Sequence, residues 1–181
     1  MGLLNKFGLF VTLTLVPWLG FAQSEPATPL DAASQSARYK LKPDVSFLGM
    51  RFKAGRGNAL SAIPFDKPYE LLTPTEQARV KSVYESMGAG DEPPFPIGGL
   101  ATLYDPLTKG QQRLLVEGAF IAEVTVSSKG EGVAITVFKT PSERVTKFVA
   151  GIALLTKYKP ALCQGVPCEM AFPIRMQLKV E

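Results

Sequence analysis

Cys163 and Cys168 are the two residues whose chemistry could be most specific in this chain. They are the only cysteines among 181 residues, and the chain contains no histidine. It therefore lacks the commonest general base and the commonest zinc ligand, and two cysteines alone cannot form a Cys/His metal site. These observations favour a function without catalysis, with no metal and no cofactor.

Two uses of the cysteine pair remain open: a structural disulfide and a thiol–disulfide oxidoreductase site. Cys163 and Cys168 are separated by four residues rather than the two of the usual redox motif, and neither opens a helix that would lower its pKa. Export to an oxidising compartment favours a structural bridge, which would stabilise the fold by about 2 kcal/mol. We predict the structural disulfide and keep thiol–disulfide exchange as the alternative.

A helix and a strand must position this pair, and both are visible in the sequence. Thr140-Pro141-Ser142-Glu143 supplies the capping chemistry of a helix start, and Pro160 prevents continuation beyond about residue 158. Apolar side chains recur on one face of this helix at Val145, Phe148, Val149, Ile152 and Leu155. The pattern predicts a helix whose apolar face covers a sheet.

Alternating residues predict three strands around that helix. Residues 118–126 and 133–138 form a predicted hairpin with a turn at 127–132, and residues 171–180 alternate again after the helix. A right-handed crossover places the first strand at the centre and the third at an edge. Pro173 lacks an amide donor, so we expect it to point away from the neighbouring strand. The predicted fold class is α+β, with a small antiparallel three-stranded sheet packed by one helix.

The N-terminal residues resemble an export signal followed by a linker. Residues 1–22 contain Lys6, an apolar run and small residues at 20–22, which predicts cleavage before Gln23; a retained inner-membrane anchor is the alternative. Residues 23–37 are small, polar and proline-containing, as in a linker. The net charge of +4 is spread along the chain and indicates no nucleic-acid partner. We therefore expect an exported protein.

Between the linker and the hairpin, residues 38–117 form a region of uncertain fold. Short apolar runs in 38–72 suggest one or two extended segments, and Thr73-Pro74-Thr75-Glu76 predicts a capped helix over about 74–87. Prolines at 93–96 impose extended geometry that two glycines end, which is typical of a domain boundary or a recognition segment. A further short helix is expected over about 105–113.

Residues 118–181 resemble the C-terminal domain of TonB-family energy transducers. The resemblance rests on Glu117-Gly118, Val124-Thr125-Val126, the Lys129-Gly130 turn, Val137-Phe138-Lys139, Lys157-Tyr158-Lys159-Pro160-Ala161 and Gly165-Val166-Pro167 before a Phe-Pro-Ile-Arg-Met strand. Pro94-Phe95-Pro96-Ile97-Gly98-Gly99 is similar to an element upstream of that domain in part of the family. Together these motifs cover between one third and one half of the chain.

The resemblance implies a periplasmic interaction module whose third strand pairs with a short extended peptide of an outer-membrane transporter. The residues expected to bind the partner are those of that strand: Phe172, Ile174, Arg175, Met176, Gln177, Leu178 and Lys179. Main-chain pairing would supply affinity, and outward side chains would tune the choice of partner. A self-associating structural module, in which two edges pair in a homodimer, is the alternative.

Overall fold

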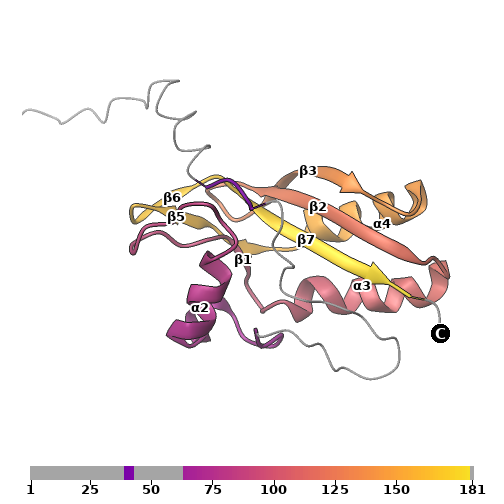
Figure 1. Ribbon diagram of the computed structural model, residues 1–181, viewed down its shortest axis with the longest axis horizontal. Helices are drawn as coiled ribbons and strands as arrows, with labels where there is room; N and C mark the ends of the chain where they lie inside the picture. The colour runs from indigo at the N-terminus through magenta and orange to yellow at the C-terminus, as the bar shows by residue number, and fades with distance from the viewer. Residues whose placement is uncertain (1–38, 43–62, 180–181) are drawn as a thin grey trace, which may run out of the picture.

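The computed structural model of the chain describes residues 39–42 and 63–179 (Figure 1). The predicted signal (1–22), linker (23–37) and extended segment 45–52 lie outside these residues. Within the described ranges, no helix has both the length and the apolar content of a membrane span. The fold is mixed α+β, as predicted, with helices packed against a small antiparallel sheet.

The central sheet has three strands in the order β3-β2-β7. β2 (Gly118–Val126) pairs with β3 (Gly132–Lys139) as the predicted hairpin, and with β7 (Met170–Leu178) on its other side. Both pairings are antiparallel. The first strand of the unit is therefore central and the third lies at an edge, which confirms the predicted order.

One face of the sheet is covered by two helices, α3 (Ala101–Leu114) and α4 (Glu143–Leu155). Figure 1 shows α4 behind β2 and β3, and α3 running along the side of β7. The buried side chains between the sheet and the helices form one core. Its members on β2, β7 and α4 include Phe120, Val124, Val145, Val149, Phe172 and Ile174. The predicted helix thus packs Val145 and Val149 on the sheet, whereas Leu155, which was predicted on the same face, is 82% exposed at the end of the helix.

α4 is shorter than predicted at both ends. The side chain of Ser142, rather than that of Thr140, caps the helix by accepting a hydrogen bond from the amide of Val145 at 3.3 Å. The helix ends at Leu155, because the Tyr158 amide bonds to the Gly130 carbonyl at 2.9 Å and requires an extended backbone there. Tertiary pairing therefore overrides the local helix signal at the C-terminal end.

The proline-rich segment is part of the folded unit. β1 (Phe95–Pro96) pairs with β4 (Tyr158–Lys159), and the Phe95 side chain is fully buried. Lys159 also lies 2.8 Å from the Glu92 carboxylate and places its ammonium 4.9 Å from the ring centre of Tyr69. The segment that could have been a boundary thus connects the N-terminal region to the end of α4.

α2 (Pro74–Lys81) begins with the predicted capping box. The Thr73 hydroxyl accepts from the Glu76 amide, and the Glu76 carboxylate accepts from the Thr73 amide at 2.7 Å. The helix ends at Lys81, short of the predicted residue 87, because the following residues bond to the segment 39–42. A one-turn helix, η1 (Tyr69–Leu71), precedes α2.

α3 is longer than the helix predicted over 105–113. It begins at Ala101 and accommodates Pro106 within its length. Gly110 permits close approach to α4, because a Cβ at this position would overlap the ring of Phe148. The glycine that weakens the helix signal in the sequence is therefore required for packing.

Candidate functional site: the two edges of the sheet

The residues predicted to bind a partner occupy alternate faces of β7. Four side chains lie in the core between the sheet and the helices, namely Phe172, Ile174, Met176 and Leu178. Arg175 and Gln177 are half-buried on the opposite face, which we call the open face, and Lys179 is exposed just beyond the strand. Only the second group and the main chain are therefore placed to contact an added peptide.

The main chain of β7 at Ala171 and Pro173 points away from β2. The Ala171 carbonyl accepts a hydrogen bond of 2.8 Å from the Tyr84 hydroxyl, so its main-chain groups face outward. Main-chain direction alternates along a strand, and Pro173 therefore also faces outward, where its missing amide donor costs no bond to β2. This arrangement agrees with the orientation expected from the sequence.

Two further outward positions of β7 are engaged by α3. The Arg175 amide bonds to the hydroxyl of Tyr104, and the Lys179 carbonyl accepts from the Gln111 side-chain amide at 2.7 Å. We refer to Tyr84, Tyr104 and Gln111 as the edge cap. All three side chains are buried, so a peptide that pairs with β7 must first displace them.

Burial keeps both tyrosines of the edge cap protonated. It raises the pKa of Tyr84 and of Tyr104 far above the ordinary value for a phenol. Carboxylate charge at Glu123 adds to the effect at Tyr84, whereas the Arg175 amide partly opposes it at Tyr104. The Tyr84 hydroxyl can therefore donate to the Ala171 carbonyl over the whole physiological range of pH, and Tyr104, which accepts from the Arg175 amide, stays uncharged.

The outer edge of β3 has no such cap. The main-chain amide and carbonyl of Thr125 face Ala134 of β3, because those of its β7 neighbour Ala171 face away from β2. Main-chain direction alternates along each strand, so the amides and carbonyls of Ile135 and Val137 face outward, away from β2. Nothing in residues 39–42 or 63–179 forms a main-chain hydrogen bond to these outward groups. Irregularities in the register at both ends of the hairpin confine the regular part of this edge to about four residues.

Glu123 is a partly buried carboxylate on the open face whose pKa is shifted by its surroundings. Partial burial raises the pKa of its carboxyl above the ordinary value, while the charges of Arg175 and Lys40 lower it and so partly compensate. The Arg175 guanidinium also donates to the Lys42 carbonyl at 3.3 Å, which holds the segment 39–42 beside this group. The charges of two cationic side chains from distant parts of the chain thus act on the Glu123 carboxyl.

We predict that Glu123→Gln removes a pH-dependent loss of stability. Because the folded-state pKa is raised, the contribution of Glu123 to stability is fully present below the ordinary value of 4.5 and is lost as pH rises through the folded value. The difference in unfolding free energy between Glu123→Gln and the wild type should therefore shift in favour of the variant from pH 4 to pH 7. Urea titrations at both values measure it, with exposed Glu85→Gln as the control.

The cysteines form the disulfide that the sequence predicts. Cys163 and Cys168 are bonded, with Cα atoms 5.8 Å apart, across the hairpin of β5 (Ala161–Cys163) and β6 (Val166–Cys168). The turn contains Gln164 and Gly165 at positive φ angles of 54° and 82°. Each Asp91 carboxylate oxygen accepts one amide at 2.7 Å, from Gly88 and from Gln164, and so fixes the turn against the preceding loop.

Reduction of this disulfide should lower the free energy of unfolding by about 2 kcal/mol. The pair belongs to a second apolar cluster with Tyr39, Leu41, Val83, Tyr84 and Met170, so loosening the hairpin also affects one residue of the edge cap. The comparison of denaturation midpoints with and without dithiothreitol tests this, because the chain has no other cysteine. Cys163→Ser/Cys168→Ser should match the reduced protein and show no further response to the reductant.

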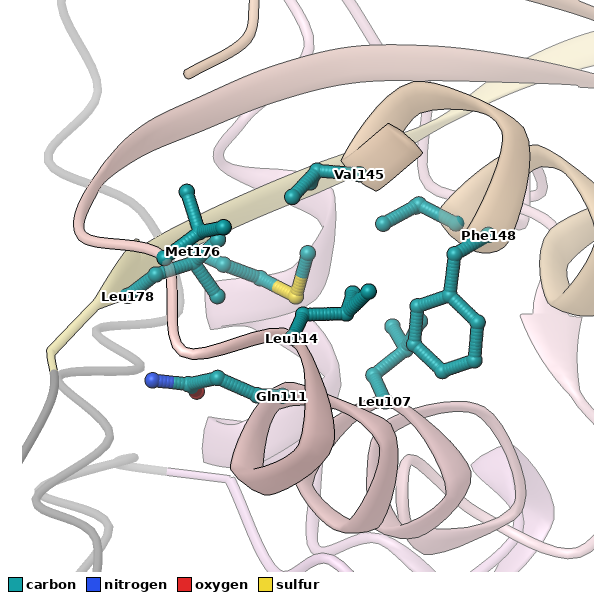
Figure 2. A pocket seen from close by; sticks show the side chains of 9 residues that line it. Leu107, Gln111, Leu114, Val145, Phe148, Met176 and Leu178 are labelled. Atoms are coloured by element: carbon teal, nitrogen blue, oxygen red, sulfur yellow. The ribbon is translucent and has the colours of Figure 1, made fainter. Parts of the chain in front are cut away.

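The apolar hollow between α3, α4 and β7 is too small for a ligand. Figure 2 shows Leu107, Leu114, Phe148 and Gln111 among the side chains that line it. Its volume is about 10 Å³, which is close to the minimum for one water molecule. A larger hollow of about 420 Å³ lies on the open face beside Glu123, Glu169 and the disulfide hairpin.

The described residues contain no group of histidine, cysteine, aspartate or glutamate side chains arranged to hold a metal ion. Comparisons of the chain with protein-family models, with curated proteins and with solved structures found no match. The arguments for a function therefore rest on the geometry of the two sheet edges.

The edge cap is the part of the site that the sequence did not predict. The sequence places Tyr84 within the helix predicted over 74–87 and Gln111 within the helix predicted over 105–113, and neither pattern indicates a contact with the last strand. Their roles depend on contacts with residues 87 and 68 positions away. The only sequence signal is Pro173, which indicates an edge strand but not the side chains that cover it.

Proposed function

We propose that the chain is an exported interaction module that binds an extended peptide by adding it to an edge of the three-stranded sheet. The observation that carries this proposal is the uncapped outer edge of β3, where the main-chain groups of Ile135 and Val137 point away from β2. Unpaired amides and carbonyls at such an edge are a template for another strand.

Of the two edges, that of β3 supports peptide addition better. Pairing with β7 requires the loss of the hydrogen bonds from Tyr84 and Gln111, each worth about 1 kcal/mol, and of the bond at Tyr104. Pairing with β3 requires no such exchange among the described residues. The predicted binding residues Phe172–Lys179 remain a second acceptor, which opens only when the edge cap is displaced.

The partner that the resemblance to TonB-family domains implies is a short peptide of an outer-membrane transporter, and the compartment is the periplasm. The disulfide is compatible with an oxidising compartment. Main-chain pairing explains how such a module could accept peptides of varied sequence, because the hydrogen bonds do not depend on side chains.

A peptide-binding assay with edge-proline variants tests the proposal. Fluorescence anisotropy would measure the affinity for labelled N-terminal segments of outer-membrane transporters. Val137→Pro removes an outward amide from β3, and Gln177→Pro removes one from β7, without removing a bond to β2. We expect Val137→Pro to weaken binding about tenfold, which corresponds to the loss of one or two hydrogen bonds, and Gln177→Pro to leave it unchanged.

Chemically modified peptides test the same pairing with the wild-type protein, so a folding defect of a variant cannot explain the result. Peptides N-methylated at alternate residues lose the amides that pair with the protein while the protein itself is unchanged. One of the two alternate sets should abolish binding and the other should not. Absence of binding by every peptide, or equal binding by both methylated sets, would overturn the proposal.

A further inference from the structure

The disulfide hairpin leads directly into the capped end of β7. Cys168 ends β6, and β7 begins at Met170 after a single intervening residue. The next residue of β7 is Ala171, whose carbonyl accepts the 2.8 Å hydrogen bond from the Tyr84 hydroxyl. The disulfide therefore lies close in sequence to the position where the edge cap closes the first part of the β7 edge.

The Tyr84 side chain packs in the same apolar cluster as the disulfide. Tyr84, Cys163 and Met170 are buried members of this cluster, and Cys168 is packed against them. The Tyr84 ring is buried here, and the ring determines where its hydroxyl lies. The hydrogen bond to Ala171 therefore depends on the packing of the β5–β6 hairpin that the disulfide closes.

Hydrogen bonds also join the hairpin to the loop that follows Tyr84. The amide of Gln164, in the turn that the disulfide closes, donates to Asp91 Oδ1 at 2.7 Å. Leu162 on β5 exchanges two main-chain hydrogen bonds of 2.9 Å with Glu92. A change in the hairpin thus reaches Tyr84 by two routes, through the apolar cluster and through this loop.

A reductant can reach the disulfide from the open face. Cys163 and Cys168 both line the hollow of about 420 Å³, and Cys168 is partly exposed. A thiolate of a dithiol attacks the Cys168 sulfur, forms a mixed disulfide and releases Cys163 as a thiolate. The second thiol of the reductant then displaces Cys168. Two electrons and two protons pass to the cysteine pair, and the dithiol leaves as a disulfide.

We propose that the Cys163–Cys168 disulfide is a redox-controlled latch on the β7 edge. Reduction by a dithiol protein of the same compartment loosens the β5–β6 hairpin and releases Tyr84 from Ala171, so a peptide that adds to β7 has one hydrogen bond fewer to displace. The inference rests on the proposed function, since it gives the condition that favours the second acceptor edge. Tyr104 packs in the main core instead, so its part of the edge cap stays in place.

Nitration of tyrosines by tetranitromethane, mapped by mass spectrometry, tests the release of Tyr84 without any peptide. Cys163→Ser/Cys168→Ser stands in for the reduced protein, because free thiols would consume the reagent. We expect nitration of Tyr84 at least about tenfold faster in this variant than in the oxidised wild type, with Tyr104 equally protected in both. Val166→Ser, at an exposed site of the same hairpin, is the control and should change neither rate.

Tyr104 distinguishes local release from general unfolding. Equal rates at Tyr84 in the variant and the wild type would overturn the inference. A rise at Tyr104 as large as that at Tyr84 would overturn it as well, because the whole fold and not the latch would then have opened.

The peptide assay measures the consequence at the edge. In Val137→Pro, reduction with dithiothreitol should strengthen peptide binding about fivefold, because one hydrogen bond fewer must break, and an added Gln177→Pro should remove this gain. Unchanged binding after reduction would overturn the latch and leave the proposed function intact. Absence of binding by the wild type in both redox states would overturn the proposed function alone, and the nitration rates would still decide whether the latch exists.

Discussion

Phe95→Ala is expected to lower the free energy of unfolding by about 4 kcal/mol. The Phe95 ring is fully buried, with its centre 5.9 Å from that of Tyr69 and 6.3 Å from that of Phe172 on β7. Its removal leaves a cavity where the proline-rich segment, η1 and the sheet meet. Urea denaturation followed by circular dichroism measures the change.

Ile97→Ala is the matched control for this prediction. Ile97 lies two residues further along the same segment but is 58% exposed, so its truncation should change stability by less than about 0.5 kcal/mol. Equal effects of the two substitutions would contradict the integration of this segment into the core and favour a mobile boundary.

Gly130→Ala is expected to lower the free energy of unfolding by at least about 3 kcal/mol. Gly130 has a positive φ of 79°, and a Cβ there would overlap the Tyr158 carbonyl oxygen. The Gly130 carbonyl also accepts the Tyr158 amide at 2.9 Å, so the turn of the hairpin cannot move away without losing that bond. Thermal and urea denaturation both measure the effect.

Two other glycines distinguish backbone strain from steric overlap as the cause of the stability that Gly130→Ala should lose. Gly165 has a φ of 82° but open space around its Cβ position, so Gly165→Ala should show the backbone strain alone, about 1–2 kcal/mol. Gly151 lies within α4 with open space as well, and Gly151→Ala should stabilise the helix by up to about 1 kcal/mol. A Gly130→Ala variant no worse than Gly165→Ala would contradict the predicted overlap with Tyr158.

The C-terminal unit could be predicted from the sequence because its signals are local. Alternation along 118–126 and 171–180 gave both faces of the sheet, and the short turn between β2 and β3 required a hairpin. The Thr73 capping box likewise involves residues only three positions apart. In each case the interaction that decides the structure lies within a few residues of the pattern that reveals it.

The predictions that failed concern helix ends, which depend on distant partners. α4 stops at Leu155 because Tyr158 bonds to Gly130, and α2 stops at Lys81 because Val83 and Glu85 bond to the segment 39–42. Helix propensity and capping patterns cannot predict these pairings, because the partners lie far apart in the sequence. The edge cap escaped prediction for the same reason, since Tyr84 reads equally well as an ordinary core residue.

The two sheet edges are protected by different means. Buried side chains bond to the outward groups of β7, whereas register irregularities shorten the free edge of β3. Exposure of the β7 edge requires that these hydrogen bonds break, whereas the irregularities of β3 only limit the length of an added strand. This asymmetry is why we propose β3 as the first edge to accept a partner, and β7 only as a second acceptor once the edge cap is displaced.

The order of the edge cap along the chain has a consequence for biosynthesis. Tyr84, Tyr104 and Gln111 all precede β7, so they are synthesised before the strand whose edge they bond. An unpaired strand edge is most hazardous in partly folded chains, where it recruits other molecules into aggregates. Because its protecting side chains already exist when β7 is made, the last strand can be capped as soon as it joins the sheet.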